Sequence, residues 1–345
     1  MTDPLFQPYQ LNSKITLKNK ILMAPLTRCF ADDDLVPTDL MVEYYAKRAD
    51  AGLIVSEATL IDPVAQGYPN TPGIYNQAQI DAWKKVTAKV HKNGGKIFCQ
   101  LWHCGRVAHS SYSNKNPVAP SAILWDANVP RSNGLSYELP TALSAQDVQK
   151  TIQTYIQTAK NAIQAGFDGV EIHGANGYLI DQFMHQSSNQ RTDEYGGSLE
   201  NRKRFGLEVV DGIIAAIGHE RTAIRLSPQA YAHNDYTKAD EMTYRELLKD
   251  LESRDLAYIH LGAFDDSIEY DYLGGKPSQF IRKNYKGTFV TCGSYTVETA
   301  RKAIANNEAD LVALGRPFIA NADLISQIQS EAKLQDYDVV MLKEL

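Results

Sequence analysis

The chain alternates between short runs of apolar or β-branched residues and longer amphipathic stretches. The short runs predict eight buried strands, at Lys20–Ala24, Leu53–Ala58, Lys96–Leu101, Gly169–His173, Thr222–Leu226, Tyr258–Leu261, Thr288–Cys292 and Leu311–Leu314. The amphipathic stretches predict helices over Asp39–Ala51, Asp81–His91, Asp147–Ala165, Leu199–Ile217, Thr243–Arg254 and Val297–Asn306. Because apolar strands that alternate with helices form a parallel sheet covered on both faces, we expect an α/β protein. Eight such units close most simply into a (β/α)8 TIM barrel.

The competing arrangement is an open, doubly wound sheet that binds a nucleotide. Such sheets usually carry a phosphate loop of the form G-x-G-x-x-G or G-x-x-x-x-G-K-[ST] after a strand. Neither motif follows a predicted strand of this chain. The pattern therefore favours the closed barrel.

No linker, charge block or low-complexity tract divides the chain, and we expect a single domain over residues 1–345. Within residues 1–19, the alternation from Leu11 to Leu17 predicts a small hairpin that plugs the lower end of the barrel. Residues 102–143 are too many for a simple loop and are rich in Pro, Ser, Asn and Trp, which predicts a lid or pocket wall over the top face. Residues 331–345 form a C-terminal tail.

Composition narrows the class of protein further. With 43% hydrophobic and 22% charged residues the chain can build a large core, and a formal net charge of -6 gives no reason to expect nucleic acid or an anionic membrane as a partner. The start lacks a signal peptide pattern and no segment is apolar for long enough to cross a bilayer, so we expect a cytoplasmic protein. The four cysteines lack C-x-x-C spacing, which predicts reduced thiols.

The most informative segment follows the fourth predicted strand. His173, Asn176 and Tyr178 place an imidazole, a carboxamide and a phenol around Gly174 and Gly177, where the chain must turn. Side chains at these spacings can face one cavity at the exit of the strand, which is where barrel enzymes carry their active sites. A lone histidine is more often part of the core. A metal site is not indicated, because H-x-H and H-E-x-x-H motifs are absent.

The last two predicted strands end in residues suited to a phosphate. Gly293 and Ser294 follow the seventh strand, and Gly315 and Arg316 follow the eighth. Backbone N–H groups and one guanidinium at this place in a barrel can hold a dianion. A simple turn with a surface charge would give the same sequence, so this interpretation depends on the fold.

Three further strand ends suggest a flat heterocycle. Gln100 has the donor and acceptor that an imide edge requires, and Arg225 suits an oxygen that becomes negative on reduction. Together they fit the pyrimidine side of a flavin. Taken singly, Gln100 could be a satisfied interior amide and Arg225 part of an internal ion pair. Thr27 is a weaker candidate, because a hydroxyl at a strand end often only caps the backbone.

These motifs together resemble the old yellow enzyme family of FMN-dependent ene-reductases. The resemblance runs from about Leu5 to about Ile328 and rests on Asn19–Arg28, Gln100–His103, His173–Leu179, Arg191–Arg202, Arg225–Pro228 and Leu314–Pro317. It implies ping-pong transfer of a hydride from NADPH to FMN and then to the C=C bond of α,β-unsaturated carbonyl or nitro compounds. It also implies small-molecule partners, including quinones, and a monomer or homodimer.

The resemblance assigns roles residue by residue. Contacts to the isoalloxazine would come from Thr27, Ala58, Gln100 and Arg225, and contacts to the FMN phosphate from Gly293, Ser294, Gly315 and Arg316. His173 and Asn176 would donate to the substrate's carbonyl or nitro oxygen, and Tyr178 would donate the proton. Tyr68 and Trp102 are expected to wall the substrate pocket, although either could be a core residue.

Two segments are not assigned to the site. The charged run Arg191–Arg202 is interpreted as structural, with residues that pair among themselves and fix the connection after the fourth strand. The tail Leu334–Leu345 lacks the aromatic and Gly-rich ending of many relatives.

Three alternative functions remain. They are a flavin-binding sensor or carrier without turnover, a dienoyl-CoA-reductase-like enzyme and a metal-dependent barrel hydrolase.

Overall fold

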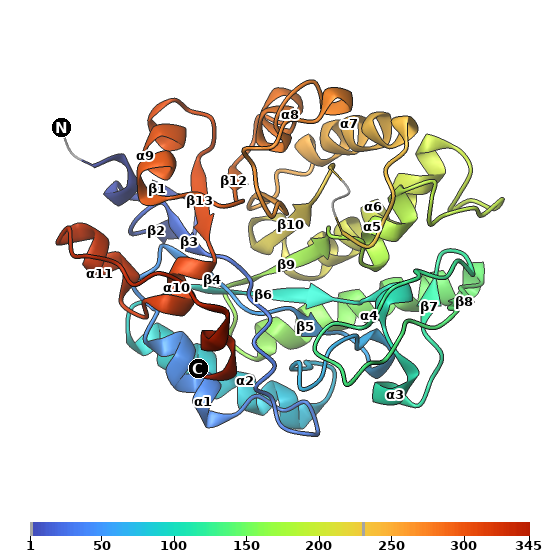
Figure 1. The fold of residues 1–345 in the computed structure, drawn as a ribbon, viewed down its shortest axis with the longest axis horizontal. Helices are drawn as coiled ribbons and strands as arrows, with labels where there is room; N and C mark the ends of the chain where they lie inside the picture. Colours follow the sequence, from blue (N-terminus) through green and yellow to red (C-terminus); the bar gives the residue numbers. More distant parts are fainter. Residues whose placement is uncertain (1–2, 230–231) are drawn as a thin grey trace.

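The structure, a computed structural model, describes residues 3–229 and 232–345. Within these residues, eight parallel strands form the barrel: β3 (Ile21–Met23), β4 (Leu53–Val55), β6 (Ile97–Trp102), β9 (Gly169–Gly174), β10 (Thr222–Leu226), β11 (Ile259–Leu261), β12 (Phe289–Thr291) and β13 (Leu311–Leu314). Neighbours pair in the order β4-β3-β13-β12-β11-β10-β9-β6, and β6 pairs with β4 to close the ring. The predicted (β/α)8 fold is confirmed, with the strands at the centre of the molecule (Figure 1).

Helices that follow the strands cover the outside of the barrel. They are α1 (Asp39–Ala46), α2 (Gln77–Lys92), α4 (Ala145–Gln164), α6 (Leu199–Ile217), α7 (Lys238–Glu252), α8 (Pro277–Asn284), α9 (Val297–Ala305) and α11 (Leu324–Gln329). The hydrophobic pattern did not predict α8 or α11. Three shorter helices lie in loops after the strands, namely α3 (Ser110–Ser113), α5 (Leu179–Met184) and α10 (Arg316–Ala320).

Some element boundaries were predicted wrongly. The second barrel strand ends at Val55 rather than Ala58, because the Glu57 N–H donates to the Tyr45 hydroxyl (2.8 Å) instead of continuing the ladder, and a separate strand β5 (Thr59–Leu60) follows. Helix α1 ends at Ala46 rather than Ala51, because the next turns close on carbonyls three residues back.

Helix α7 begins earlier than the expected Thr243. The Thr237 side chain and Asp240 form a capping box that fixes the first turn from Lys238. The predicted boundaries of β10, β13 and α6 agree with the structure.

The interior of the barrel is apolar at its lower end. The hairpin of β1 (Tyr9–Gln10) and β2 (Thr16–Leu17) is antiparallel. Its neighbours Leu11 and Ile15 share one buried cluster with the inward residues Leu22, Phe98 and Tyr258. The hairpin therefore closes this end of the barrel with apolar side chains, and ligands must approach from the other end.

Residues 102–143 cross the opposite end, where the strands exit. The Arg131 Nη1 donates to the Thr27 carbonyl (3.0 Å) beyond β3, and Arg106 Nη2 donates to the His233 carbonyl (2.7 Å) beyond β10. The segment contains the short parallel pair β7 (Val118–Ala119) and β8 (Thr141–Ala142). These contacts place it over the strand exits, and its action as a lid stays a prediction.

The C-terminal tail packs beside α10, where Figure 1 draws it in dark red. Arg28, just after β3, donates from Nη2 to the carbonyl of Met341 (2.9 Å) and also to that of Glu344. The tail is thus tied to the first strand exit. No helix in the described ranges combines the length and apolar character needed to cross a lipid bilayer, and the four cysteines are unpaired.

Candidate active site

The turn between β9 and α5 carries His173 at its start and Tyr178 at its end. Asn176 and Gly177 have positive φ angles of 61° and 74°, so the backbone is left-handed at both positions. A Cβ atom on Gly177 would lie 2.3 Å from the Ala232 carbonyl oxygen. Glycine is therefore required there for both conformation and space.

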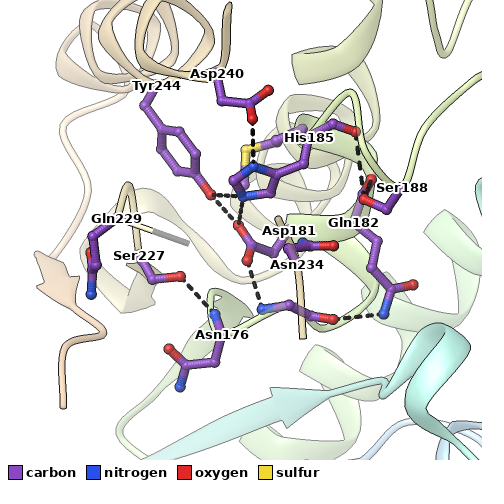
Figure 2. Close-up of polar contacts among 12 residues, drawn as sticks. Asn176, Asp181, Gln182, His185, Ser188, Ser227, Gln229, Asn234, Asp240 and Tyr244 are labelled. Atoms are coloured by element: carbon purple, nitrogen blue, oxygen red, sulfur yellow. Dashed lines mark hydrogen bonds and ion pairs between the residues drawn. The ribbon is translucent and has the colours of Figure 1, made fainter. Parts of the chain in front are cut away.

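Two side chains hold the backbone of this turn. The Asn176 N–H donates to Ser227 Oγ from the loop after β10 (2.7 Å), and the Gly177 N–H donates to Asp181 Oδ2 on α5 (2.7 Å). Figure 2 shows the hydrogen bond between Asn176 and Ser227. Because the Asn176 and Tyr178 side chains leave from this backbone, the two bonds fix where they point.

Tyr178 lies in a cluster of aromatic rings. Its ring centroid is 4.8 Å from that of His173 and 5.0 Å from that of Trp102, in edge-to-face arrangements. The Tyr68 hydroxyl lies 3.4 Å from the Tyr178 hydroxyl. His233, which sequence reasoning missed, contributes a fourth ring at 5.5 Å. The structure thus brings Tyr68 and Trp102 to the same point as His173 and Tyr178.

The surroundings set the protonation states of His173 and Tyr178. Burial, followed by the charges of Arg225 and His260, holds the pKa of His173 well below its usual value, so the imidazole is neutral. Burial, followed by the effect of Tyr68, raises the pKa of Tyr178 well above its usual value, so the phenol keeps its proton. The buried His173 Nδ1 has no hydrogen-bond partner within the described residues.

A cavity of about 220 Å³ opens at the exits of β3, β10, β12 and β13, and the turn after β9 lines it through Asn176. Its lining includes six of the predicted site residues, namely Asn176, Arg225, Gly293, Ser294, Gly315 and Arg316. Arg316 Nη2 donates to Ser294 Oγ (2.9 Å), and its guanidinium lies 5.0 Å from the centre of the Phe264 ring. Arg316 is therefore anchored at one end of the cavity, where an anionic group can meet it.

Three predicted cofactor contacts, Thr27, Ala58 and Gln100, do not line this cavity. Thr27 and Ala58 follow β3 and β4, and Gln100 lies within β6. Glu57, which precedes Ala58, accepts hydrogen bonds from the backbone N–H groups of Arg28 (3.1 Å) and Cys29 (3.3 Å). Burial raises the pKa of Glu57 to about 7.

Gln100 belongs to a buried polar layer whose other members, Glu171 and His260, were not predicted. The Gln100 amide donates to Glu171 Oε1 (2.7 Å), and His260 Nδ1 donates to Glu171 Oε2 (2.9 Å). All three side chains are buried. Glu171 stands two residues before His173 on the same face of β9, so the period-two rule for strands could have found it.

A second buried cluster stands behind the turn (Figure 2). His185 lies between two carboxylates, with Nε2 3.2 Å from Asp181 Oδ1 and Nδ1 3.1 Å from Asp240 Oδ2. The Tyr244 hydroxyl also donates to Asp181. Although burial opposes the charge, the carboxylates raise the pKa of His185 to about 9. The spacing of Asp181 on α5 and His185 just after it was the available signal, but α7 supplies the other two members, Asp240 and Tyr244.

The charged run 191–202 lies outside the cavity lining. Arg191 Nε donates to Asp193 Oδ1 (2.9 Å), and Arg191 Nη1 donates to the Pro120 carbonyl (2.9 Å). Arg202 Nη2 donates to Thr243 Oγ1 on α7 (2.8 Å). These contacts join loops and helices, in agreement with the structural interpretation. Nowhere in residues 3–229 and 232–345 do three or more His, Cys, Asp or Glu side chains converge to hold a metal ion.

A family model described as the NADH:flavin oxidoreductase / NADH oxidase family matches residues 4–335. Among curated proteins, 12-oxophytodienoate reductase 7 of Oryza sativa subsp. japonica is 41% identical over 356 residues, which cover 97% of this chain and 90% of that protein. A probable flavin mononucleotide-dependent alkene reductase of Leishmania infantum is 40% identical over 347 residues, covering 97% and 93%.

Solved structures give the same result. The old yellow enzyme homologue from Zymomonas mobilis aligns with a TM-score of 0.92 and 41% identity, over 98% of this chain and 96% of that one. Morphinone reductase in complex with tetrahydroNAD aligns with a TM-score of 0.89 and 41% identity, over 98% and 93%.

Proposed function

Since the chain belongs to the NADH:flavin oxidoreductase / NADH oxidase family, we propose that it is an FMN-dependent ene-reductase that uses NADPH. Its acceptors are small molecules with an activated C=C bond, such as α,β-unsaturated carbonyl or nitro compounds. The observation that carries the proposal is the contact of a neutral His173 with a protonated Tyr178 on a turn whose Asn176 lines a cavity together with two arginines.

The residues that line the cavity fit FMN. Arg316, anchored on Ser294, stands where a phosphate needs a cation, and Gly293 has a φ of 124° that brings backbone close to the cavity. Arg225 is 8% exposed and its Nε has no partner within the described chain, so it is free to meet the cofactor's polar edge. When bound, FMN supplies a carrier that accepts a hydride from a nicotinamide and passes it to an acceptor.

The turn after β9 supplies the groups that act on the acceptor. His173 and Asn176 can each donate an N–H to one oxygen of the acceptor, which draws electron density from the conjugated C=C bond and stabilises the negative charge that develops. A neutral imidazole suits this role, because it donates a hydrogen bond without placing a further positive charge in the pocket. Tyr178, which keeps its proton, can donate it to the carbon that becomes basic.

Anaerobic titration tests this proposal. The purified protein should show the visible absorption of bound FMN, lose it on addition of NADPH, and regain it when 2-cyclohexenone is added. A parallel titration with NADH compares the two reductants. Colourless, folded protein that takes up no added FMN would refute the proposal, and so would a flavin that NADPH fails to bleach.

Substitution of Tyr178 separates an ene-reductase from a flavin carrier. Tyr178→Phe should keep FMN and its reduction by NADPH, while the reoxidation step with a weakly activated alkene slows by about 100-fold or more. Tyr155→Phe is the matched control, because Tyr155 is also fully buried but lies on α4 against Phe205. Unaltered reoxidation in Tyr178→Phe would exclude the phenol as proton donor.

A further inference from the structure

Arg225 is a buried cation without a carboxylate partner in the part of the chain that the structure describes. It is 8% exposed, and its guanidinium hydrogen bond is from Nη2 to the sulfur of Cys292 (3.8 Å). Its Nε has no partner within that part. Buried arginines are normally paired with an acidic group. The charge of Arg225 is therefore available to the molecule that occupies the cavity it lines.

A carboxylate stands close by but is engaged elsewhere. Glu171 lies on β9, next to the strand that carries Arg225, and its register partner on that strand is Ala223. Both of its oxygens are used, one by the Gln100 amide (2.7 Å) and the other by His260 Nδ1 (2.9 Å). The register partner of His260 on this strand is Arg225 itself, so His260 reaches Glu171 across the strand that carries Arg225.

The Glu171–His260 contact is an ion pair. Burial alone would raise the pKa of Glu171, but the charge and hydrogen bond of His260 lower it, followed by the charge of Arg225. Burial alone would lower the pKa of His260, but Glu171 raises it. The negative charge of Glu171 and the positive charge of His260 offset each other. The positive charge of Arg225 is therefore the net charge of this layer.

We propose that His260 is a positioning residue that keeps Glu171 away from Arg225, so that Arg225 presents an unpaired positive charge to the flavin and raises its reduction potential. This inference rests on the proposed FMN-dependent function. Its physical basis is that reduced flavin is more negative than oxidised flavin, so an unpaired cation at its edge binds the reduced form more tightly.

Reduction potentials of the FMN holoenzyme test this inference in three variants: His260→Gln, Glu171→Gln and the double variant. The potential is measured by anaerobic equilibration with a reference dye. His260→Gln frees the carboxylate to pair with Arg225 and should weaken binding of reduced relative to oxidised FMN about tenfold, a fall of about 30 mV for a two-electron couple. The double variant removes the carboxylate as well and should recover most of that fall.

The double variant distinguishes an electrostatic role of His260 from a purely structural one. If the role were purely structural, the reduction potential of the double variant would be at least as low as that of His260→Gln. An unchanged potential in His260→Gln, or no recovery in the double variant, would overturn the inference. If His260→Gln does not fold, Glu171→Gln provides the test. This variant leaves Arg225 unpaired, so a lowered reduction potential would overturn the inference. If the wild-type protein binds no FMN, the proposed function fails; if all forms bind FMN and NADPH reduces it but the potentials do not follow this pattern, only the role of His260 fails.

Discussion

The buried His185 makes a quantitative prediction about stability and pH. Its side chain is fully buried between Asp181 and Asp240, and these carboxylates raise its pKa from 6.5 to about 9. Because the folded protein holds this proton more tightly than the unfolded chain, the stabilisation is complete below pH 6.5 and is lost as the pH rises through about 9. At about 1.4 kcal/mol per pKa unit, the loss is about 3 kcal/mol.

The perturbation is His185→Gln, which removes the charge and keeps a side chain of similar size. Urea unfolding of both proteins is followed by circular dichroism from about pH 6 to about pH 10, at fixed ionic strength and fixed FMN concentration. The free energy of unfolding of the wild type should exceed that of the variant most at the acidic end. This difference should decrease by about 3 kcal/mol toward the alkaline end. Titrating groups that do not contact His185 are common to both proteins and cancel in the difference.

His91→Gln is the matched surface control. His91 also contacts a carboxylate, with Nε2 2.8 Å from Asp168 Oδ2, but its side chain is 38% exposed. Exposed pairs contribute at most about 1 kcal/mol, so this variant should follow the wild-type curve closely. If the wild type and His185→Gln instead lose stability in parallel across the whole range, the imidazole is not charged in the folded protein and the reasoning is wrong.

Three further predictions concern the cavity, the turn and a buried carboxyl. Arg316→Ala should raise the FMN dissociation constant by about 10- to 100-fold, as loss of a charge-assisted hydrogen bond does, and fluorescence titration that finds no change would count against the phosphate role. Gly177→Ala should destabilise the protein by about 1–3 kcal/mol, since its φ is 74° and a Cβ meets the Ala232 carbonyl; an unchanged melting temperature would contradict this. Burial raises the pKa of Glu57 from 4.5 to about 7, so the folded protein loses about 3 kcal/mol of stability as the pH rises through that range. Glu57→Gln should flatten this part of the plot of unfolding free energy against pH.

The fold was predictable because strands buried on both faces leave continuous apolar runs in the sequence. β10 and β13 were placed correctly for this reason, and α6 was placed correctly from its amphipathic pattern and the Gly218 that ends it. Boundaries failed where a local side chain replaces a backbone partner, as at the Tyr45 hydroxyl beyond β4. Helix α8 was missed because its eight residues, Pro277–Asn284, are too few for a clear period of 3.6.

The site was predictable where one strand exit carries several polar residues. The positions of His173 and Tyr178 follow from the turn after β9, and barrel geometry places Arg225 and Arg316 at the same end. The link between His185 and Asp240 could not be derived, because it depends on how α5 packs against α7. Sequence spacing specifies neighbours within one element, whereas contacts between distant elements require the packed structure.

Three buried histidines show how neighbours decide the chemistry of one side chain. His185 faces two carboxylates and His260 faces one, and the pKa of each is raised in spite of burial. His173 is equally buried, but its charged neighbours are cations, and its pKa is lowered. Of these three histidines, His173 is therefore the one that remains neutral, and its Nδ1 has no hydrogen-bond partner among the described residues. A carboxylate introduced beside His173 would make it a cation, so the lack of an acidic side chain there matters as much to the proposed reaction as the imidazole itself.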